Sequence, residues 1–235
     1  MSLPVVFVHG TRVSGTMWAP VRALLRAPSA APDLPGHGRR RGRPYDTEAA
    51  CDVVAQAITD LGGRALVVGL SLGGYVGIAA AARHPGLVAG LVAMGCTTRP
   101  DRPIAHAYRF MGRLASRNAE WADRVSRVAL RRMLPGAAGA AMIEGGLSSE
   151  VVASVIAAIT AEDPLTSLAA YPGRVWLVNG ARDPFRADEQ AFLRACVDGS
   201  LTHVPGRGHL TVLADPARLA RFVDAAAGEV SGCPA

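Results

Sequence analysis

Short, unbroken apolar runs that alternate with helical segments restrict the fold of this chain more than any other feature. The clearest runs are residues 5–8, 65–68 and 175–178, and each is followed by apolar residues at helical spacing. A strand that is apolar at every position is buried on both faces, which is typical of parallel sheets with helices on both sides. The pattern therefore predicts an α/β fold with a mostly parallel, open sheet.

Periodicity and turn residues place the other expected elements. Three further strands are expected at residues 29–32, 87–94 and 201–204, which makes a sheet of about six strands, and the pattern is weakest at residues 29–32. Helices that flank the sheet are expected at residues 17–26, 47–61, 72–83, 186–197 and 216–227.

One long stretch between two of these strands contains helical patterns and no strand pattern. We therefore predict a helical insertion at residues 98–168 and a core formed by residues 1–97 and 169–235. Asn118 and Ser148 are expected to cap two helices of the insertion, and residues 136–146 are expected to be mobile because small side chains dominate there. The expected packing faces are Tyr108, Met111 and Leu114; Trp121, Val125 and Val128; and Val151, Val152, Val155, Ile156 and Ile159.

Composition excludes several kinds of chemistry. The 235 residues include 25 basic side chains, and every one of them is arginine. A chain without lysine has no phosphate-binding GK[ST] loop, no Schiff-base lysine and no serine–lysine catalytic pair. Half of the residues are hydrophobic but only 5% are aromatic, so valine, leucine and alanine should form the core.

Cysteines and uncharged stretches indicate the cellular compartment in which this protein is expected. The four cysteines, Cys51, Cys96, Cys196 and Cys233, lack the spacing of a metal site and are interpreted as thiols in a reducing compartment. The N-terminus lacks the basic segment of a secretory signal, and glycines interrupt the longest uncharged run, residues 65–82. We therefore expect a cytoplasmic protein with no membrane span, no metal and no cofactor.

The strongest local motif is Gly69-Leu70-Ser71-Leu72-Gly73, which joins an apolar run to a helix. A serine in this position lies on a tight, strained turn, and the residues two positions away must be small so that strand and helix can approach. The N-terminus of the helix also offers a backbone N–H, that of Leu72, to a developing oxyanion. The motif predicts that Ser71 is a nucleophile.

A nucleophilic serine needs a base, and the base needs an acid that orients it. His209 follows the last expected strand and Asp183 follows the strand before it, so both should lie with Ser71 at the carboxyl edge of the sheet. The order Ser71, Asp183, His209 is the one expected of this architecture. Asp101 remains an alternative acid, and Asp163 is a weaker one because Asp163 and the following proline indicate a turn that closes the insertion.

A second oxyanion donor is expected in the loop after the first strand, His9-Gly10-Thr11. Gly10 lets the backbone approach the nucleophile, and the N–H of Thr11 should point at the developing charge. His9 is expected to brace this loop. Arg12, next in the chain, and Trp18 are expected to contact the substrate.

Five segments together resemble the α/β-hydrolase superfamily, and they are collinear over most of the chain. The resemblance implies a serine hydrolase in which Ser71 is the nucleophile, His209 the base and Asp183 the acid. It also implies that residues 98–168 form a cap over the site and that the usual first two strands of the family are missing. The five segments are His9-Gly10, Asp33-Leu34-Pro35-Gly36-His37-Gly38, Gly69-Leu70-Ser71-Leu72-Gly73-Gly74, Gly180-Ala181-Arg182-Asp183 and Gly206-Arg207-Gly208-His209.

The resemblance leaves the substrate open. Similar epoxide hydrolases and haloalkane dehalogenases have aspartate in place of the serine, similar hydroxynitrile lyases use a lysine, and the large lipases carry an H-G-G-G motif; none of these matches this chain. We expect hydrolysis of an ester, thioester or lactone of a small acyl substrate through an acyl-enzyme on Ser71. A carbon–carbon bond hydrolase with the same three residues, and a non-hydrolytic cyclase or ligand-binding protein, remain alternatives.

Positive charge is concentrated in the expected cap. Residues 99–132 contain nine arginines and three acidic residues, so this stretch accounts for the whole net charge of +6. A basic cap can steer an anionic partner, such as a carboxylate substrate, a coenzyme A thioester or an acyl carrier protein, and a merely solvated face is the alternative. No nucleic-acid motif accompanies the charge. A second arginine cluster consists of Arg39, Arg40, Arg41 and Arg43.

Overall fold

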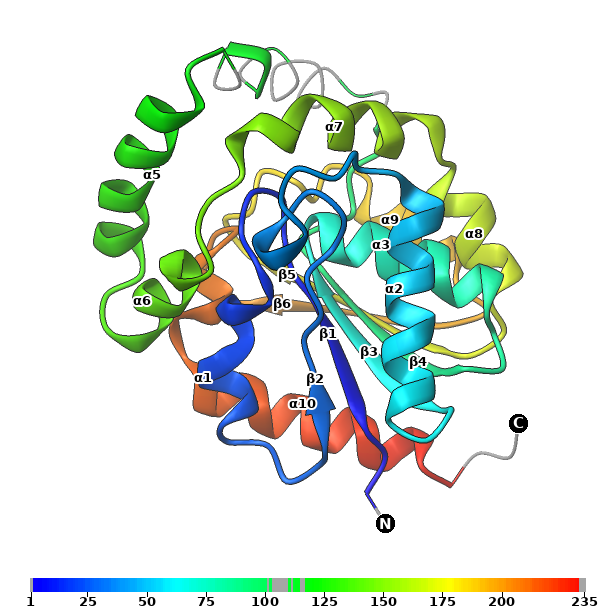
Figure 1. Cartoon of the computed structure of the whole chain (residues 1–235). Helices are drawn as coiled ribbons and strands as arrows, with labels where there is room; N and C mark the ends of the chain where they lie inside the picture. The colour runs from blue at the N-terminus through cyan, green and yellow to red at the C-terminus, as the bar shows by residue number, and fades with distance from the viewer. Residues whose placement is uncertain (1, 101, 103–109, 111, 115–116, 233–235) are drawn as a thin grey trace.

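The centre of the molecule is a six-stranded sheet, seen in a computed structural model that describes residues 2–100, 102, 110, 112–114 and 117–232 (Figure 1). The order across the sheet is β2-β1-β3-β4-β5-β6, and every neighbouring pair is parallel. The predicted mostly parallel sheet of about six strands is confirmed. The strands are β1 Val5–Val8, β2 Ser29–Ala30, β3 Ala65–Leu70, β4 Val88–Met94, β5 Arg174–Gly180 and β6 Asp198–Val204.

Helices cover both faces of the sheet, because side chains along each strand alternate between two hydrophobic clusters. In β1, Val6 and Val8 belong to the first cluster, whereas Val5 and Phe7 belong to the second. This alternation explains why the strand is apolar at every position. The first cluster packs against α2 Thr47–Asp60, α3 Leu72–Arg83, α8 Pro164–Ala170 and α9 Glu189–Ala195, and the second against α1 Ala19–Arg22 and α10 Pro216–Val230 (Figure 1).

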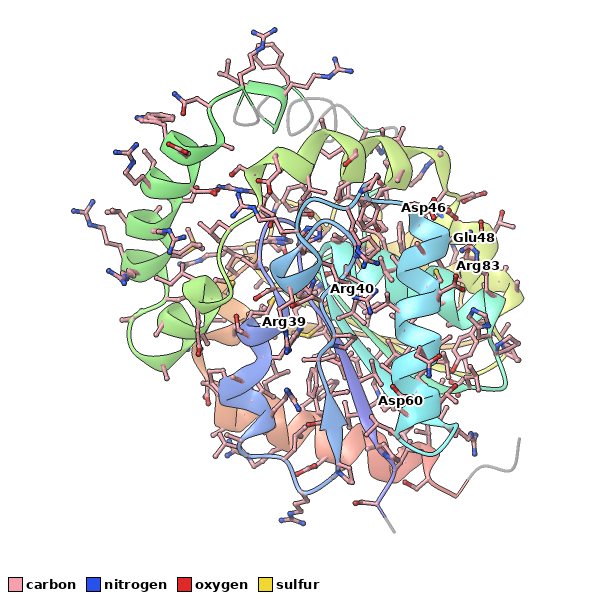
Figure 2. The ribbon with its side chains drawn as sticks, viewed as in Figure 1. Arg39, Arg40, Asp46, Glu48, Asp60 and Arg83 are labelled. Atoms are coloured by element: carbon pink, nitrogen blue, oxygen red, sulfur yellow. The ribbon has the colours of Figure 1, made fainter. Side chains whose placement is uncertain are left out.

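Four of the five predicted flanking helices are present: α3 has the predicted bounds, and α2, α9 and α10 have shifted ends. Asp46 caps the N-terminus of α2, because its carboxylate accepts the N–H of Ala49 at 2.8 Å. Figure 2 labels Asp46 at this end of the helix. The helix expected at residues 17–26 is instead a 3-10 turn, η1 Gly15–Trp18, followed by the short α1. Pro20 explains the break, because proline fits only the first turn of a helix.

Helices also make up most of the described residues from 117 to 170, between β4 and β5. Three of them are called the inserted helices below: α5 Ala119–Met133, α6 Ala137–Glu144 and α7 Val152–Ala161. In Figure 1, α7 lies above the carboxyl ends of the strands, α5 lies at the left, and α6 lies lower, beside α1. The 3-10 turn η3 Ser149–Val151 leads into α7. The helix that follows α7, α8, packs beside α3 and buries Leu168 in the first cluster. The division into a core and a cap at residue 168 therefore stays a prediction.

The orientation of α5 differs from the expectation. Trp121, Val125 and Val128 are 60%, 48% and 51% exposed, so they do not form its packing face. Asp123 is buried instead, with its carboxylate 3.7 Å from the guanidinium of Arg12. The polar side chains of Asp123 and Ser126 face inward because they have a partner in Arg12, and helical periodicity cannot reveal such a partner.

Other expectations for this stretch have mixed outcomes. Asn118 caps α5 as predicted, accepting the N–H of Trp121 at 3.2 Å, but Ser148 makes no side-chain capping bond to η3. Alanine-rich α6 forms within residues 136–146 and buries its apolar side chains, and the expected mobility of this segment stays a prediction. The residues Asp101, His106, Tyr108, Arg109 and Met111 lie outside the described part of the chain.

No single helix in the described ranges is long and apolar enough to cross a membrane. One bent pair, Ala137–Glu144 with Ser149–Ala161, meets the test of length and composition when its two parts are taken together.

Candidate active site

Ser71 lies in a strained turn between β3 and α3. Its backbone has φ 58° and ψ −117°, a conformation that residues other than glycine rarely adopt. A Cβ atom at Gly69 would lie 2.1 Å from the carbonyl oxygen of Gly73, and one at Gly73 would lie 2.1 Å from that of Val8. Only glycine fits at these two positions, so the strand and the helix approach closely and the turn presents Ser71 at the carboxyl end of β3.

His209 and Asp183 meet beyond the carboxyl ends of β6 and β5. The Nδ1 atom of His209 lies 2.9 Å from Oδ2 of Asp183, and Oδ1 of Asp183 accepts the N–H of Phe185 at 2.8 Å. The Asp183 side chain is fully buried, whereas that of His209 is 19% exposed. Because an ionised carboxylate can only accept, Nδ1 of His209 donates, and Nε2 is left as the basic atom of the ring.

Two hollows meet at Ser71, His209 and Thr11, which line both of them. We call them the α7 lobe and the α5 lobe after the inserted helices that line them. Their volumes are about 670 Å³ and about 860 Å³, including the part open to solvent. The α7 lobe is also lined by Tyr75, Arg99, Ile156, Ile159 and Phe185, and the α5 lobe by Arg12, Met17, Leu130, Met142 and Leu147.

The loop after β1 runs beside Ser71. A Cβ atom at Gly10 would lie 3.7 Å from Cβ of Ser71, so the two backbones are close together. Thr11 follows Gly10 in this loop, and Leu72 is the first residue of α3, where backbone N–H groups have no acceptor within the helix. The two expected oxyanion donors therefore belong to segments that adjoin the serine.

His9 braces this loop, as predicted. It is fully buried; its Nε2 accepts the N–H of Leu34 at 2.9 Å, and its Nδ1 lies 2.8 Å from the carbonyl oxygen of Gly10. Burial lowers the pKa of His9 to about 3 and also lowers the pKa of its neighbour His37, so both rings are neutral at pH 7. With both nitrogens bound to the backbone, His9 cannot act as a base toward Ser71.

The structure does not bring Trp18 to either lobe. Trp18 is fully buried, and its ring packs against that of Phe7 with the centroids 4.9 Å apart. Arg12 does line the α5 lobe, but its guanidinium donates to Oγ of Ser126 at 2.6 Å. The side chain of Arg12 is therefore bound by α5 of the protein itself.

Of the two alternative acids, only Asp163 is described by the structure, and it serves a different purpose. Asp163 caps α8 and accepts the hydroxyl of Thr166 at 2.6 Å, which agrees with the predicted turn. Asp101 lies outside the described residues. Within the described residues, no group of three histidine, cysteine or acidic side chains is close enough to hold a metal ion.

Two aromatic residues beside the serine were not predicted. Tyr75 lies one helical turn after Ser71, and its hydroxyl donates to the carbonyl oxygen of Thr98 at 2.5 Å. The spacing of four residues from Ser71 was a usable signal for Tyr75. Phe185 packs on His209 with ring centroids 4.7 Å apart, a contact set by the turn after β5 that no local pattern indicates.

A parallel sheet with a serine on a strained strand–helix turn, and a histidine–aspartate pair at the same edge, defines the class of nucleophile-elbow proteins. The family model described as "Alpha/beta hydrolase family" matches residues 5–222. The chain belongs to this family.

Parts of the chain are similar to curated esterases. An esterase of Mycobacterium tuberculosis is 37% identical over 97 residues, which are 40% of this chain and 33% of that protein. A pimeloyl-[acyl-carrier protein] methyl ester esterase of Neisseria meningitidis is 41% identical over 90 residues, which are 37% of this chain and 34% of that protein. The chain therefore matches about a third of the length of these relatives.

Solved structures match nearly the whole chain. A thermophilic esterase from Thermogutta terrifontis has a TM-score of 0.79 and 24% identity, covering 98% of this chain and 91% of that one. An E-2-(acetamidomethylene)succinate hydrolase has a TM-score of 0.77 and 23% identity, covering 95% and 90%. At this level of identity the likeness shows that the fold is shared.

Proposed function

We propose that this protein is a serine hydrolase that cleaves an ester of a small acyl substrate. The observation that carries the proposal is the hydrogen bond from His209 to the buried Asp183, beside two lobes that His209 shares with Ser71. The similarity to proteins named as esterases supports the reaction class. In this proposal Ser71, His209 and Asp183 are the catalytic triad.

Each residue has one role in the proposed reaction. Oγ of Ser71 attacks the acyl carbon while Nε2 of His209 takes the serine proton, and Asp183 stabilises the resulting imidazolium. The N–H groups of Thr11 and Leu72 donate to the carbonyl oxygen as it becomes negative. His209 then gives its proton to the leaving alcohol. Water, activated by the same histidine, finally releases the acid and regenerates Ser71.

The lining of the two lobes supports an acyl ester as substrate. Apolar side chains dominate both, with Ile156 and Phe185 in the α7 lobe and Met142 and Leu147 in the α5 lobe. An ester bound at Ser71 can therefore place its acyl part in one lobe and its alcohol part in the other. Thioesters and lactones have the same acyl carbon and remain within this proposal.

A fluorophosphonate probe tests for an activated serine. We expect the wild-type chain to be labelled and Ser71→Ala to remain unlabelled. Ser154→Ala, which removes a hydroxyl that donates to the carbonyl oxygen of Val151 just before α7, is the matched control and should be labelled like the wild type. An unlabelled wild type would contradict the proposal and favour a ligand-binding member of the fold.

A substrate comparison tests the reaction itself. Short p-nitrophenyl esters, acyl thioesters and lactones are assayed side by side, and the highest kcat/KM is expected for an ester. If Ser71 is labelled but only a carbon–carbon bond of a diketone-like substrate is cleaved, the alternative hydrolase is correct.

We further propose that the substrate is anionic or linked to a carrier. Four arginines of α5 are exposed: Arg124, Arg127, Arg131 and Arg132. In Figure 2, side chains of α5 project away from the body of the molecule. One similar protein is named as acting on an ester linked to an acyl carrier protein. The second arginine cluster contributes less free positive charge, because Arg41 is paired with Glu150 and Arg39 lies 3.6 Å from Asp33. Figure 2 labels Arg39 and Arg40 of this cluster.

Salt dependence tests this charge hypothesis. Raising the ionic strength should lower kcat/KM for an anionic ester and leave that for a neutral ester of the same acyl group unchanged, because salt screens long-range attraction. The variant Arg124→Gln/Arg127→Gln should show a weaker salt effect on the anionic ester. Equal responses of the two esters would contradict the hypothesis.

We also propose a cytoplasmic location. The described cysteines Cys51, Cys96 and Cys196 are free thiols, as expected in a reducing compartment. Burial raises the pKa of Cys51 to about 11, which keeps this thiol protonated.

A further inference from the structure

The loop that carries Thr11 is attached to the inserted segment through Arg12. Arg12 has φ 73°, a conformation that is unfavourable for a residue with a side chain. Its carbonyl oxygen accepts the N–H of Ser148 at 2.8 Å. Its Nη2 donates to Oγ of Ser126 at 2.6 Å and lies 3.7 Å from Oδ1 of Asp123. Both the backbone and the side chain of Arg12 are therefore bound by residues between β4 and β5.

Asp123 links Arg12 to a second arginine of the core. Asp123 is 8% exposed and accepts the hydroxyl of Ser149 at 2.6 Å. The other carboxylate oxygen of Asp123 lies 3.6 Å from Nη2 of Arg41. Arg41 in turn donates to both carboxylate oxygens of Glu150, from Nε at 2.5 Å and from Nη2 at 2.9 Å. A buried carboxylate that loses its cationic partners raises the free energy of the folded state. This cluster therefore favours one position of α5 on the core, which is called the seating of α5 below.

The same loop has a second link to the inserted helices. Oγ1 of Thr16 donates to the carbonyl oxygen of Ala141 in α6 at 2.8 Å and accepts the N–H of Gly145 at 3.2 Å. The loop after β1 is thus bound to α5 through Arg12, and η1, which follows the loop, is bound to α6 and its end through Thr16. A displacement of the inserted helices would pull on the segment that contains Thr11.

We propose that Arg12 is a positioning residue that couples the seating of α5 to the oxyanion donor at Thr11. The inference rests on the proposed function. A strained backbone persists only where its surroundings hold it, so release of the Arg12 side chain lets the Thr11–Arg12 turn relax and moves the Thr11 N–H. An oxyanion donor acts in the transition state, so its displacement lowers kcat and leaves KM nearly unchanged.

A direct contact between Arg12 and an anionic substrate would give a different result. In that case Asp123→Asn would free the guanidinium of Arg12, and KM for an anionic ester would fall. In the positioning role the same variant lowers kcat for a neutral and an anionic ester alike, because Asp123 is needed to hold Arg12.

The experiment compares kcat and KM for a neutral p-nitrophenyl ester in the wild type and four variants: Ser126→Ala, Asp123→Asn, Arg12→Gln and Arg12→Gln/Asp123→Asn. We expect kcat to fall about tenfold or more in the variants of Arg12 and Asp123, and less in Ser126→Ala, with KM within about twofold. The double variant should lose no more than the worse single variant, since the two residues act as a unit. Arg221→Gln, an exposed charge change on α10, is the control and should match the wild type.

A second readout separates positioning from a loss of folding. An arylboronic acid that forms a tetrahedral adduct with Ser71 should bind more weakly by about the factor that kcat loses. A merely destabilised variant has a lower Tm but keeps kcat per folded molecule and its boronate affinity.

Three results would overturn the inference alone while the wild type is active: an unchanged kcat in the single variants, a change of KM confined to the anionic ester, or losses that multiply in the double variant. An inactive wild type would overturn the proposed function and this inference with it.

Discussion

At Ser71 the strain of the backbone and the exposure of the side chain have the same cause. The glycines at positions 69 and 73 let β3 and α3 approach so closely that the residue between them takes φ 58°. Such a conformation costs about 1–3 kcal/mol for a residue other than glycine. In return, Ser71 reaches both lobes from the carboxyl end of the strand.

This strain predicts an unusual order of stabilities for variants at Ser71. Ser71→Gly should be more stable than Ser71→Ala by about 1 kcal/mol, because glycine adopts positive φ without strain. Urea denaturation of the two inactive variants measures the difference. At Ser154, inside α7, the order should reverse, since glycine destabilises a helix by about 1 kcal/mol relative to alanine. The same order at both positions would contradict the strain.

Loss of the charge on Asp183 should abolish most of the activity. In Asp183→Asn the amide leaves Nδ1 of His209 in the wrong tautomer, and kcat should fall by about 10⁴-fold with little change in KM. Steady-state kinetics with a short ester measures this loss. Asp52→Asn, an exposed change on α2, should be silent. Nearly full activity of Asp183→Asn would contradict the role of Asp183 and favour Asp101, the alternative acid.

At the scale of elements, the close contact between β1, β3 and α3 depends on Gly73. Its Cα faces the carbonyl oxygen of Val8 across a gap too small for a methyl group. We expect Gly73→Ala to lose about 1–3 kcal/mol of unfolding free energy because strand and helix must separate. Gly86→Ala, where a Cβ atom meets nothing within 4 Å, should change stability by less than about 0.5 kcal/mol. Equal effects in denaturant titrations would contradict this account.

The helix α5 shows where a periodic pattern is ambiguous. Its sequence has an apolar arc with Trp121, Val125 and Val128, and a polar arc with Asp123 and Ser126. The apolar arc predicts burial, but the polar arc faces the core because Arg12 binds there. A pairing across 114 positions of the chain decided the orientation.

At the scale of the whole molecule, buried histidines should make stability depend on pH. The pKa of His9 is about 3 in the folded state against an ordinary 6.5, and that of His37 is also lowered. Below pH 6.5 the unfolded chain therefore binds protons that the folded chain does not. The stabilisation from neutral His9 is complete above pH 6.5 and is lost as the pH falls toward 3, by up to about 1.4 kcal/mol per pH unit. His37 acts in the same direction because its pKa is also lowered.

Urea denaturation between pH 6.5 and about pH 5 isolates this effect, since most carboxylates stay ionised there. The unfolding free energy should decrease as the pH falls through this window, and His37→Gln should reduce the slope. A free energy that does not change between these pH values would contradict the assignment of two neutral, buried rings.

Contiguous patterns in the sequence determined the parallel sheet, the turn at Ser71 and the places of Asp183 and His209 at one edge. These follow from the sequence because burial on both faces makes a strand apolar throughout, and because parallel strands bring their carboxyl ends to the same edge. Only the tertiary structure decided the burial of Trp18, the two lobes, the inward face of α5 and the binding of Arg12 by Ser126 and Asp123. Each of these depends on side chains that are distant in the chain, and their pairing is selected by packing and charge after the local elements have formed.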